Sequence, residues 1–260
     1  MATHSIQPND RITFKVYYED ASLLVVGKPA HIVTLPGKGH EHDTLLNALF
    51  ARYGNQLQNM GRVREFGLLH RLDRETSGLV IVALRPSAYD AMLEAFRERA
   101  IAKFYWAVTK GTPEPAEGVI QKPILEYEGR AARDPRVKKI ARVSPRGKPA
   151  VTAYRVIESA TAGALVECRA VTGRLHQVRV HMDSIGCPIL GDDIYGPTAV
   201  REASPRLALH AHRVAFPHPL TGERVDVGAP MPEDLKPVLK KMGLRTPSVV
   251  RRGASGGAGA

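Results

Sequence analysis

The spacing of hydrophobic residues divides the chain into many short strands and a few helices. Residues 14–26, FKVYYEDASLLVV, predict two strands around the turn-prone sequence EDAS. The apolar run LVIVAL, residues 79–84, has the composition of a buried strand, and KFYWAV, residues 103–108, has the aromatic and β-branched content of another. The later segments VTAYRVI, ALVECRAV and LALHAHRVAF also predict strands.

Helical spacing is present in three places. It covers LLNALFARY, residues 45–53, then a segment that starts at Pro86, and finally residues 175–184, which Thr172 and Gly173 open. In the second helix Ser87 is the predicted N-cap, with Asp90 as its capping-box partner. Many strands with few interspersed helices predict an α+β fold, a single domain built on a mixed, largely antiparallel β-sheet with flanking helices and loops.

The domain boundaries follow changes in composition. Residues 1–13 are a lead-in, residues 14–245 form the predicted domain, and the glycine-rich residues 246–260 are expected to be disordered. Within the domain, residues 129–148 are an expected insertion that carries eight Lys or Arg residues and a single acidic residue, Asp134. This segment is the most basic part of the chain.

Composition narrows the class of protein. The chain of 260 residues is 43% hydrophobic and 24% charged, as globular proteins are, and no apolar run approaches the roughly 18 residues of a membrane span. The N-terminus does not resemble a secretory signal, and Cys168 and Cys187 have no metal-ligand spacing, so we expect a cytoplasmic protein. Lys and Arg total 37 against 26 Asp and Glu, and this net charge of +11 favours a polyanionic partner, either nucleic acid or an anionic membrane surface.

The segment HRLDRETSG, residues 70–78, places Asp73 between Arg71 and Arg74, ahead of the predicted buried strand. Thr76 and the two residues after it are expected to form a turn. An ionised aspartate can act as a base, a metal ligand or a nucleophile. The flanking guanidinium groups disfavour a metal because they repel cations, and they stabilise an ionised carboxylate. A surface ion pair at the start of a strand is the alternative.

Two further segments combine cations with groups that can bind a base. In TGRLHQVRVHM, residues 172–182, Arg174 falls in the first turn of the predicted helix, where a cluster of cations indicates an anionic partner. His176 and His181 are five positions apart rather than the four that place zinc ligands on one helix face, so each is interpreted as a structural residue. In KFYWAVTKG, residues 103–111, Tyr105 alternates with core positions, and simple packing is the alternative role.

Together these segments resemble the RluA-type pseudouridine synthases. That family carries HRLDxxTSG, KxYxAxVxG and GRxHQxRxH. The three segments follow in that order here, and the second departs from its pattern at Thr109. The opening YYEDASLLVVGKPAHIVTLPG is similar to the family's first strands and KPxG loop, with His31 where a glycine is common, and the resemblance covers residues 14–230. The sequence Val108-Thr109-Lys110 is more polar than the usual end of the KxYxAxVxG strand.

The resemblance implies an active-site cleft across the sheet and a role for each matching residue. Asp73 matches the catalytic aspartate, Tyr105 the tyrosine that stacks on the target base, and Arg174 the arginine that pairs with the aspartate across the cleft. Arg71 matches an arginine that helps to displace the target nucleotide. We also expect RNA contacts from the following residues: His70, Arg74, Thr76, His176, Gln177, Arg179, Lys138, Lys139 and Arg142.

The implied reaction is the isomerisation of a uridine within structured RNA, either a tRNA or a ribosomal RNA stem-loop. It requires no cofactor or metal, the flipping of the target base costs a few kcal/mol, and the basic segment 129–148 is expected to clamp phosphates. The position of Asp73 leaves no room for an N-terminal RNA-binding domain, so a compact member of the family is expected, and a monomer is the default expectation. Two alternatives are a catalytically silent RNA-binding factor, which the intact Asp73, Tyr105 and Arg174 disfavour, and an N-glycosidase, which a mass-neutral product would exclude.

Overall fold

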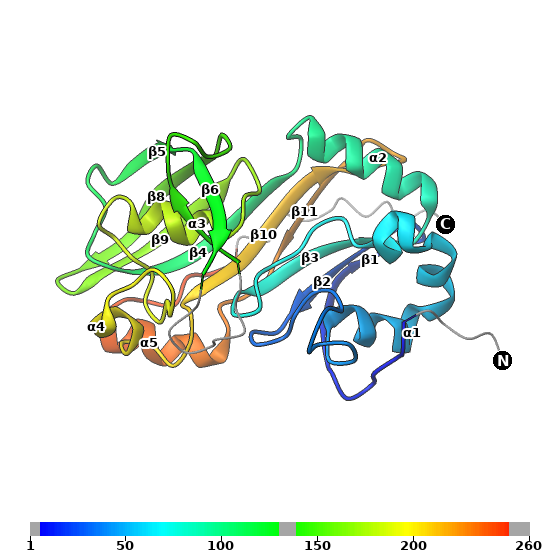
Figure 1. Cartoon of the computed structure of the whole chain (residues 1–260), viewed down its shortest axis with the longest axis horizontal. Helices are drawn as coiled ribbons and strands as arrows, with labels where there is room; N and C mark the ends of the chain where they lie inside the picture. The colour runs from blue at the N-terminus through cyan, green and yellow to red at the C-terminus, as the bar shows by residue number, and fades with distance from the viewer. Residues whose placement is uncertain (1–5, 130–138, 250–260) are drawn as a thin grey trace. The chain divides into compact units, whose positions relative to one another are not determined.

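A computed structural model of the chain describes residues 6–129 and 139–249, which form two compact units (Figure 1). The described part of unit 1 comprises residues 6–101, 213–229 and 249, and that of unit 2 comprises residues 102–129, 139–212 and 230–248. Strand β10, Leu209–Pro217, contributes its first residues to unit 2 and its last residues to unit 1.

Unit 1 is a sheet covered by helices. Its strands lie in the order β1-β2-β3-β10-β11, and the pairs β1–β2, β2–β3 and β10–β11 are antiparallel. The elements besides β10 are β1 (Lys15–Glu19), β2 (Leu23–Lys28), α1 (Leu45–Met60), the 3-10 helix η1 (Arg62–Gly67), β3 (Ser77–Ala83), α2 (Pro86–Arg97) and β11 (Arg224–Gly228).

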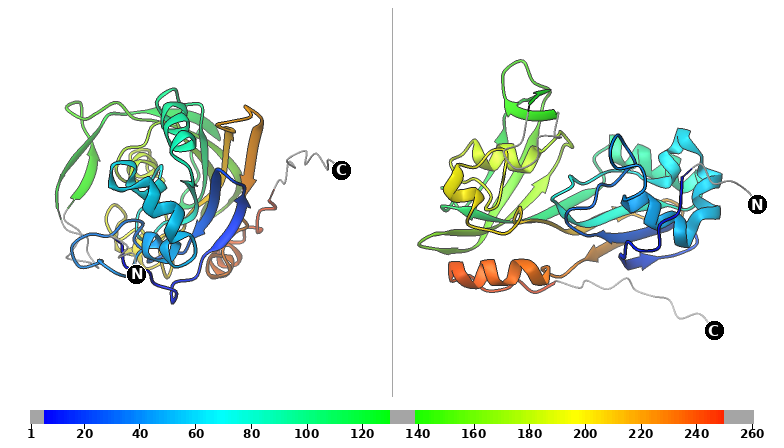
Figure 2. Two further views of the ribbon diagram at one scale, coloured as in Figure 1. Left: turned by 90° about the vertical axis from the view of Figure 1, so that its right-hand side faces the viewer. Right: turned by 60° about the horizontal axis from the view of Figure 1, so that its bottom comes forward.

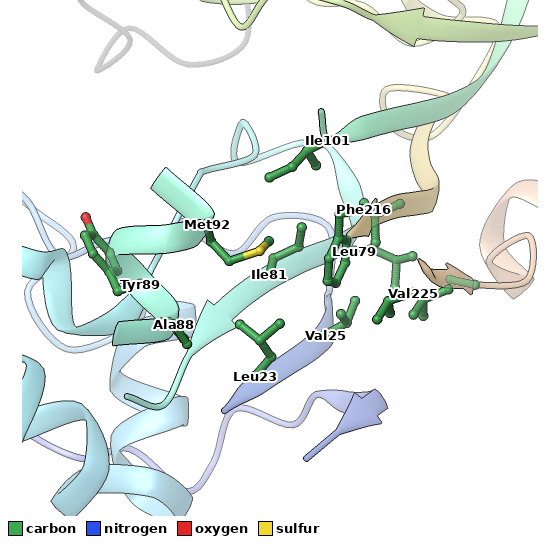
Figure 3. Packing of buried hydrophobic residues seen from close by; sticks show 14 of the residues in the cluster. Leu23, Val25, Leu79, Ile81, Ala88, Tyr89, Met92, Ile101, Phe216 and Val225 are labelled. Atoms are coloured by element: carbon green, nitrogen blue, oxygen red, sulfur yellow. The ribbon is translucent and has the colours of Figure 1, made fainter. Parts of the chain in front are cut away.

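The core of unit 1 forms where α2 packs on the sheet. Every residue of β3 is buried, and Ile81 lies against Met92 and Ala88 of α2, with Leu23 of β2 alongside (Figure 3). Burying each such aliphatic side chain contributes about 1.5–3 kcal/mol. This packing fixes the end of β3 that follows the HRLDRETSG segment.

Unit 2 is built on strands in the order β10-β4-β9-β8-β5, with a separate two-stranded hairpin β6–β7. Its elements besides β10 are β4 (Ala102–Lys110), β5 (Glu117–Gln121), β6 (Ile124–Glu128), β7 (Lys139–Val143), β8 (Val151–Ala160), β9 (Gly163–Ala170), α3 (Gln177–Asp183), α4 (Thr198–Arg201), the 3-10 helix η2 (Glu233–Leu235) and α5 (Lys236–Met242). Helices α3 and α5 lie on opposite sides of this sheet, and the β6–β7 hairpin projects from the side that carries α3 (Figure 2).

The strand register places Tyr105 on the side of the unit 2 sheet that carries α3. The Thr152 hydroxyl of β8 contacts the side chains of Gln177 and His181 in α3, which identifies the side that Thr152 faces. Thr152 pairs with Ala170 of β9, and two positions earlier Cys168 pairs with Tyr105 of β4. Because paired residues and residues two apart share a face, Tyr105 points to the α3 side.

The predicted fold class is confirmed, since both units combine largely antiparallel strands with flanking helices. The predicted strands within 14–26 and over 103–108 match β1, β2 and β4. Among residues 6–129 and 139–249, none of the helices has both the length and the apolar character that crossing a membrane requires. The predicted disorder of the C-terminal tail concerns mainly residues 250–260, which lie outside the described residues.

The predicted start of α2 at Pro86 is confirmed, but its predicted N-cap and the predicted start of α3 were wrong. Pro86 occupies the first turn of α2 and Arg85 is its N-cap, so Ser87 lies inside the helix, and Asp90 pairs with Arg64 instead of closing a capping box. Helix α3 begins two residues later than expected, because His176 adopts a left-handed conformation with φ of 52°. Arg174 therefore lies in the loop before the helix rather than in its first turn.

Two other boundaries also differ from the prediction. The turn expected at Thr76–Gly78 lies at Arg74 and Glu75, and Ser77 already belongs to β3. Helix α1 continues beyond residue 53 to Met60, although Tyr53 itself has a non-helical backbone.

Candidate active site

In unit 1 the residues on either side of Asp73 are held by buried hydrogen bonds. Leu72 is buried, and the Thr34 hydroxyl donates to its carbonyl at 2.9 Å and accepts from its N–H at 3.2 Å. The Thr76 N–H donates to the Asp73 carbonyl at 3.1 Å, which closes the turn. Since Asp73 is partly exposed while Leu72 and Thr76 are buried and hydrogen-bonded through their backbones, the backbone holds this carboxylate in a defined place.

A buried lysine fixes the other side of the turn. Lys28 is 2% exposed, and its ammonium group donates to the carbonyls of Pro29, Ile32 and Arg74 at 2.8, 2.6 and 3.2 Å. Three carbonyl acceptors match the three donors of an ammonium group, so the buried charge is well solvated by the protein. Lys28 therefore ties the loop after β2 to the residue that follows Asp73.

The arginines of HRLDRETSG take different positions. The Arg74 guanidinium donates to Glu75 at 2.8 Å, and Glu75 also pairs with His31 at 2.6 Å, whereas Arg71 is exposed. His31 has φ of 66°, a left-handed conformation that glycine adopts most easily.

Two more predicted RNA contacts in this segment lie partly or fully inside the protein. His70 accepts a hydrogen bond from the N–H of Ile81 at 3.0 Å, and its ring lies beside Phe96 at 5.5 Å between ring centroids. Thr76 is 2% exposed, and its hydroxyl has no hydrogen-bond partner among the described residues. Their positions indicate that they shape the turn around Asp73.

In unit 2, Gln177 organises the loop that carries Arg174. Its side-chain oxygen accepts from the Thr172 hydroxyl at 2.6 Å and from the Arg174 N–H at 3.1 Å, and its amide nitrogen donates to Val151 and Thr152 of β8 at 2.9 Å each. Gln177 is 4% exposed, so it acts as a buried link between this loop and the sheet.

Arg174 is held on its side-chain end as well. Its Nε donates to the carbonyl of Pro149 at 3.1 Å, and the side chain remains partly exposed. The ammonium group of Lys103 lies near Gly173, 3.7 Å from the position of a Cβ added there, and Lys103 shares the face of β4 with Tyr105. Burial lowers the pKa of Lys103. The face of unit 2 that carries α3 thus gathers Lys103, Tyr105 and Arg174.

Arg179 and His181 have structural positions in α3. Arg179 is 2% exposed and makes two hydrogen bonds with Asp192, at 2.8 and 2.7 Å, so the expected contact between its guanidinium and RNA is replaced by a buried ion pair. His181 is fully buried between Thr152 and the carbonyl of Lys122, both at 2.9 Å, as the interpretation of a structural histidine predicted. Burial lowers the pKa of His181.

The basic hairpin is described only in part. Lys139 and Arg142 of β7 are exposed, and the Arg142 guanidinium lies over the ring of Tyr127 in β6, 5.2 Å from its centroid. Lys138, the third residue expected to contact phosphates there, lies outside the described residues.

Comparison with known proteins identifies the family. The RNA pseudouridylate synthase family model matches residues 22–184, which include Asp73, Tyr105 and Arg174. The chain belongs to this family. It is 39% identical to the ribosomal large subunit pseudouridine synthase D of Zymomonas mobilis, over 91% of this chain and 74% of that protein. The resemblance to the RluA-type synthases is confirmed, and the enzyme is an isomerase that acts on RNA.

Solved structures give the same assignment for the synthase. Human RNA pseudouridylate synthase domain containing 4 superposes with a TM-score of 0.68 at 28% identity, over 90% of this chain and 94% of that chain. Human RNA pseudouridylate synthase domain containing 1 superposes with a TM-score of 0.65 at 25% identity, over 94% of this chain and all of that chain.

Several of the residues that hold the loops of the synthase have only weak signals in the sequence. Lys28 and Thr34 lie in the KPxG-like loop, and Lys103 stands two positions before Tyr105, so their motifs point to them without giving their roles. Asp192 lies in GDDIYG, outside the three motifs, and only the structure shows that it pairs with Arg179.

Proposed function

We propose that Asp73 is the residue that carries the isomerisation. The observation that supports this role best is its setting, because Leu72 and Arg74 on either side are pinned by buried hydrogen bonds while the Asp73 side chain is partly exposed. A reacting group gains rate when its position is defined before the substrate arrives.

The reaction breaks the N1–C1′ bond of a uridine, turns the uracil and joins its C5 to C1′. The C5 proton is then lost and N1 gains a proton, so the product has the same mass as the substrate. Asp73 acts as nucleophile or base in this sequence. Because no electron and no group is exchanged with a second molecule, the reaction calls for no cofactor.

Tyr105 and Arg174 are the proposed partners of Asp73 in the reaction. A partly exposed tyrosine ring on a rigid strand offers a flat surface for a flipped base, and stacking of this kind contributes about 1–3 kcal/mol per base. The bond from Arg174 Nε to Pro149 orients the guanidinium and leaves the N–H groups of its terminal nitrogens to meet an anion.

The proposed substrate is a stem-loop of large-subunit ribosomal RNA. This choice is supported by relatives such as the Zymomonas mobilis protein, whose name refers to the ribosomal large subunit. The target uridine is flipped out of its stack at a cost of a few kcal/mol, and the exposed Lys139 and Arg142 of the hairpin bind phosphates nearby. A tRNA stem-loop is the alternative substrate.

Mapping pseudouridine in RNA from cells with and without the gene tests this proposal. We expect one or a few sites in large-subunit ribosomal RNA to lose pseudouridine and to regain it when the gene is restored. Loss of sites only in tRNA would contradict the ribosomal substrate, and an unchanged map would contradict the proposed function.

A further inference from the structure

The ring of Tyr195 is fixed in unit 2 by charged and apolar contacts. It lies in the loop between α3 and α4, where its N–H and that of Ile194 donate to Asp192 at 3.1 and 2.9 Å. The guanidinium of Arg179, itself paired with Asp192, lies over the Tyr195 ring at 5.2 Å from the centroid. The ring also packs against the buried cluster that includes Val180 of α3. These contacts hold the hydroxyl group at one place.

The Tyr195 hydroxyl joins two elements that the proposed function uses. It accepts a hydrogen bond from the N–H of Ala141 in β7 at 2.9 Å, and it lies 2.8 Å from Nδ1 of His176. The phenol oxygen accepts from Ala141 and can donate its single proton to Nδ1. A neutral His176 then carries its own proton on Nε2, since the bond at one ring nitrogen selects the tautomer.

His176 belongs to the loop that presents Arg174. It follows Arg174 by two positions, and its left-handed backbone, φ of 52°, ends the loop where α3 begins. A residue other than glycine needs support to hold this conformation. The bond to Tyr195, together with an edge-to-face contact at 5.7 Å between ring centroids, provides that support.

We propose that Tyr195 is a positioning residue of the synthase, which sets the orientation and the protonated nitrogen of His176 and thereby holds the Arg174 loop. The inference rests on the proposed role of Arg174. The same hydroxyl accepts a hydrogen bond from the Ala141 N–H in β7, so one side chain contacts both the β6–β7 hairpin and the loop before α3.

Tyr195→Phe tests the proposal, because it removes the hydroxyl and keeps the ring. The matched control is Tyr154→Phe, since Tyr154 also lies in unit 2 and its hydroxyl donates to the carbonyl of Pro115 at 3.2 Å rather than to the loop. We expect Tyr195→Phe to lower the single-turnover rate at saturating RNA by about fivefold to tenfold, the equivalent of one lost hydrogen bond. Its Kd for RNA should change by less than about twofold, and Tyr154→Phe should retain the wild-type rate.

A second readout is independent of activity. In protein whose histidines are ¹⁵N-labelled, the ring signals of His176 are those that disappear in His176→Gln. Their chemical shifts should report the Nε2–H tautomer in the wild type and in Tyr154→Phe. In Tyr195→Phe they should report a mixture of the two tautomers. Unchanged shifts in Tyr195→Phe would overturn the proposal, and so would weaker RNA binding with an unchanged rate. If the wild type formed no pseudouridine, the proposed function would fail, while the ¹⁵N shifts would still decide the role of Tyr195.

Discussion

Replacement of Arg179 by methionine should destabilise unit 2 without removing an RNA contact. The side chains of Arg179 and Asp192 are 2% and 1% exposed, and the substitution leaves the Asp192 carboxylate buried without its counter-ion. Burial opposes the charged form of Asp192, but Arg179 and two backbone N–H groups outweigh it and hold the pKa of Asp192 below its usual value. In the variant only the two backbone N–H groups still oppose burial, so Asp192 either stays charged with poor solvation or takes up a proton, and either outcome costs stability.

The size of the effect follows from this geometry. Removing one partner of a buried ion pair costs about 3–5 kcal/mol. The N–H groups of Ile194 and Tyr195 remain to solvate Asp192, so we expect the lower end, about 3 kcal/mol. In a chain of this size that corresponds to a fall in melting temperature of about 6–12 °C.

Intrinsic fluorescence measures this loss directly, because the single tryptophan, Trp106, lies in β4 of the same unit. The double variant Arg179→Met/Asp192→Asn is the control, since it removes both charges and should recover part of the lost stability. The salt dependence of RNA binding should match that of the wild type. A loss of unfolding free energy below about 1 kcal/mol, together with a salt slope of RNA binding lowered by about 0.7–0.9, would refute this reasoning. It would indicate that Arg179 contacts RNA.

Two other predictions concern pH and RNA affinity. Burial, together with nearby cations, lowers the pKa of His210 from 6.5 to about 3. As the pH falls below 6.5, His210 takes up a proton in the unfolded chain before it does so in the folded chain, and the folded state therefore loses stability. Between pH 7 and pH 5 this effect should lower the free energy of unfolding by about 2 kcal/mol. In chemical denaturation, the free energy of unfolding of His210→Gln should depend less on pH than that of the wild type. An equally steep pH dependence would contradict the assignment. Neutralising Lys138, Lys139 and Arg142 should weaken RNA binding and lower the slope of log K against log[salt] by about 2–3, with little change in turnover of bound RNA. As a control, neutralising the three lysines of α5 should leave the affinity and its salt slope unchanged. A drop in turnover with unchanged binding would contradict the proposed contact between the hairpin and phosphates.

Sequence patterns predicted seven of the strands because their signals are local, but they did not predict β5, β6 or β11. Alternation of apolar residues and β-branched composition are properties of a few consecutive residues, and β3 and β4 formed where these signals were strong. The N-cap of α2 and the start of α3 were predicted less well, since Pro86 at the first helical position and the left-handed His176 decide them and neither effect changes the apolar spacing.

The residues of the candidate site were likewise predicted where the signal is local and missed where it is not. The motifs pointed to Asp73, Tyr105 and Arg174, but not to the long-range hydrogen bonds that hold their loops, such as those of Lys28 and Tyr195. Those partners come from other segments, and a hydrogen bond between residues far apart in the chain leaves no periodic signal. Arg179 shows the converse, because its position in a basic motif indicated RNA while its ion pair with Asp192 is buried.

The most direct test of the account is tritium release from RNA labelled with 5-³H-uridine, measured with Asp73→Asn. Asn has nearly the same shape as Asp but cannot act as nucleophile or base, so we expect turnover to fall by at least about 10³-fold while melting temperature and RNA affinity stay close to those of the wild type. Asp90→Asn, which removes an exposed carboxylate of α2 in the same unit, is the matched control and should retain full activity. Substantial tritium release by folded Asp73→Asn would contradict the central claim that this carboxylate carries the isomerisation.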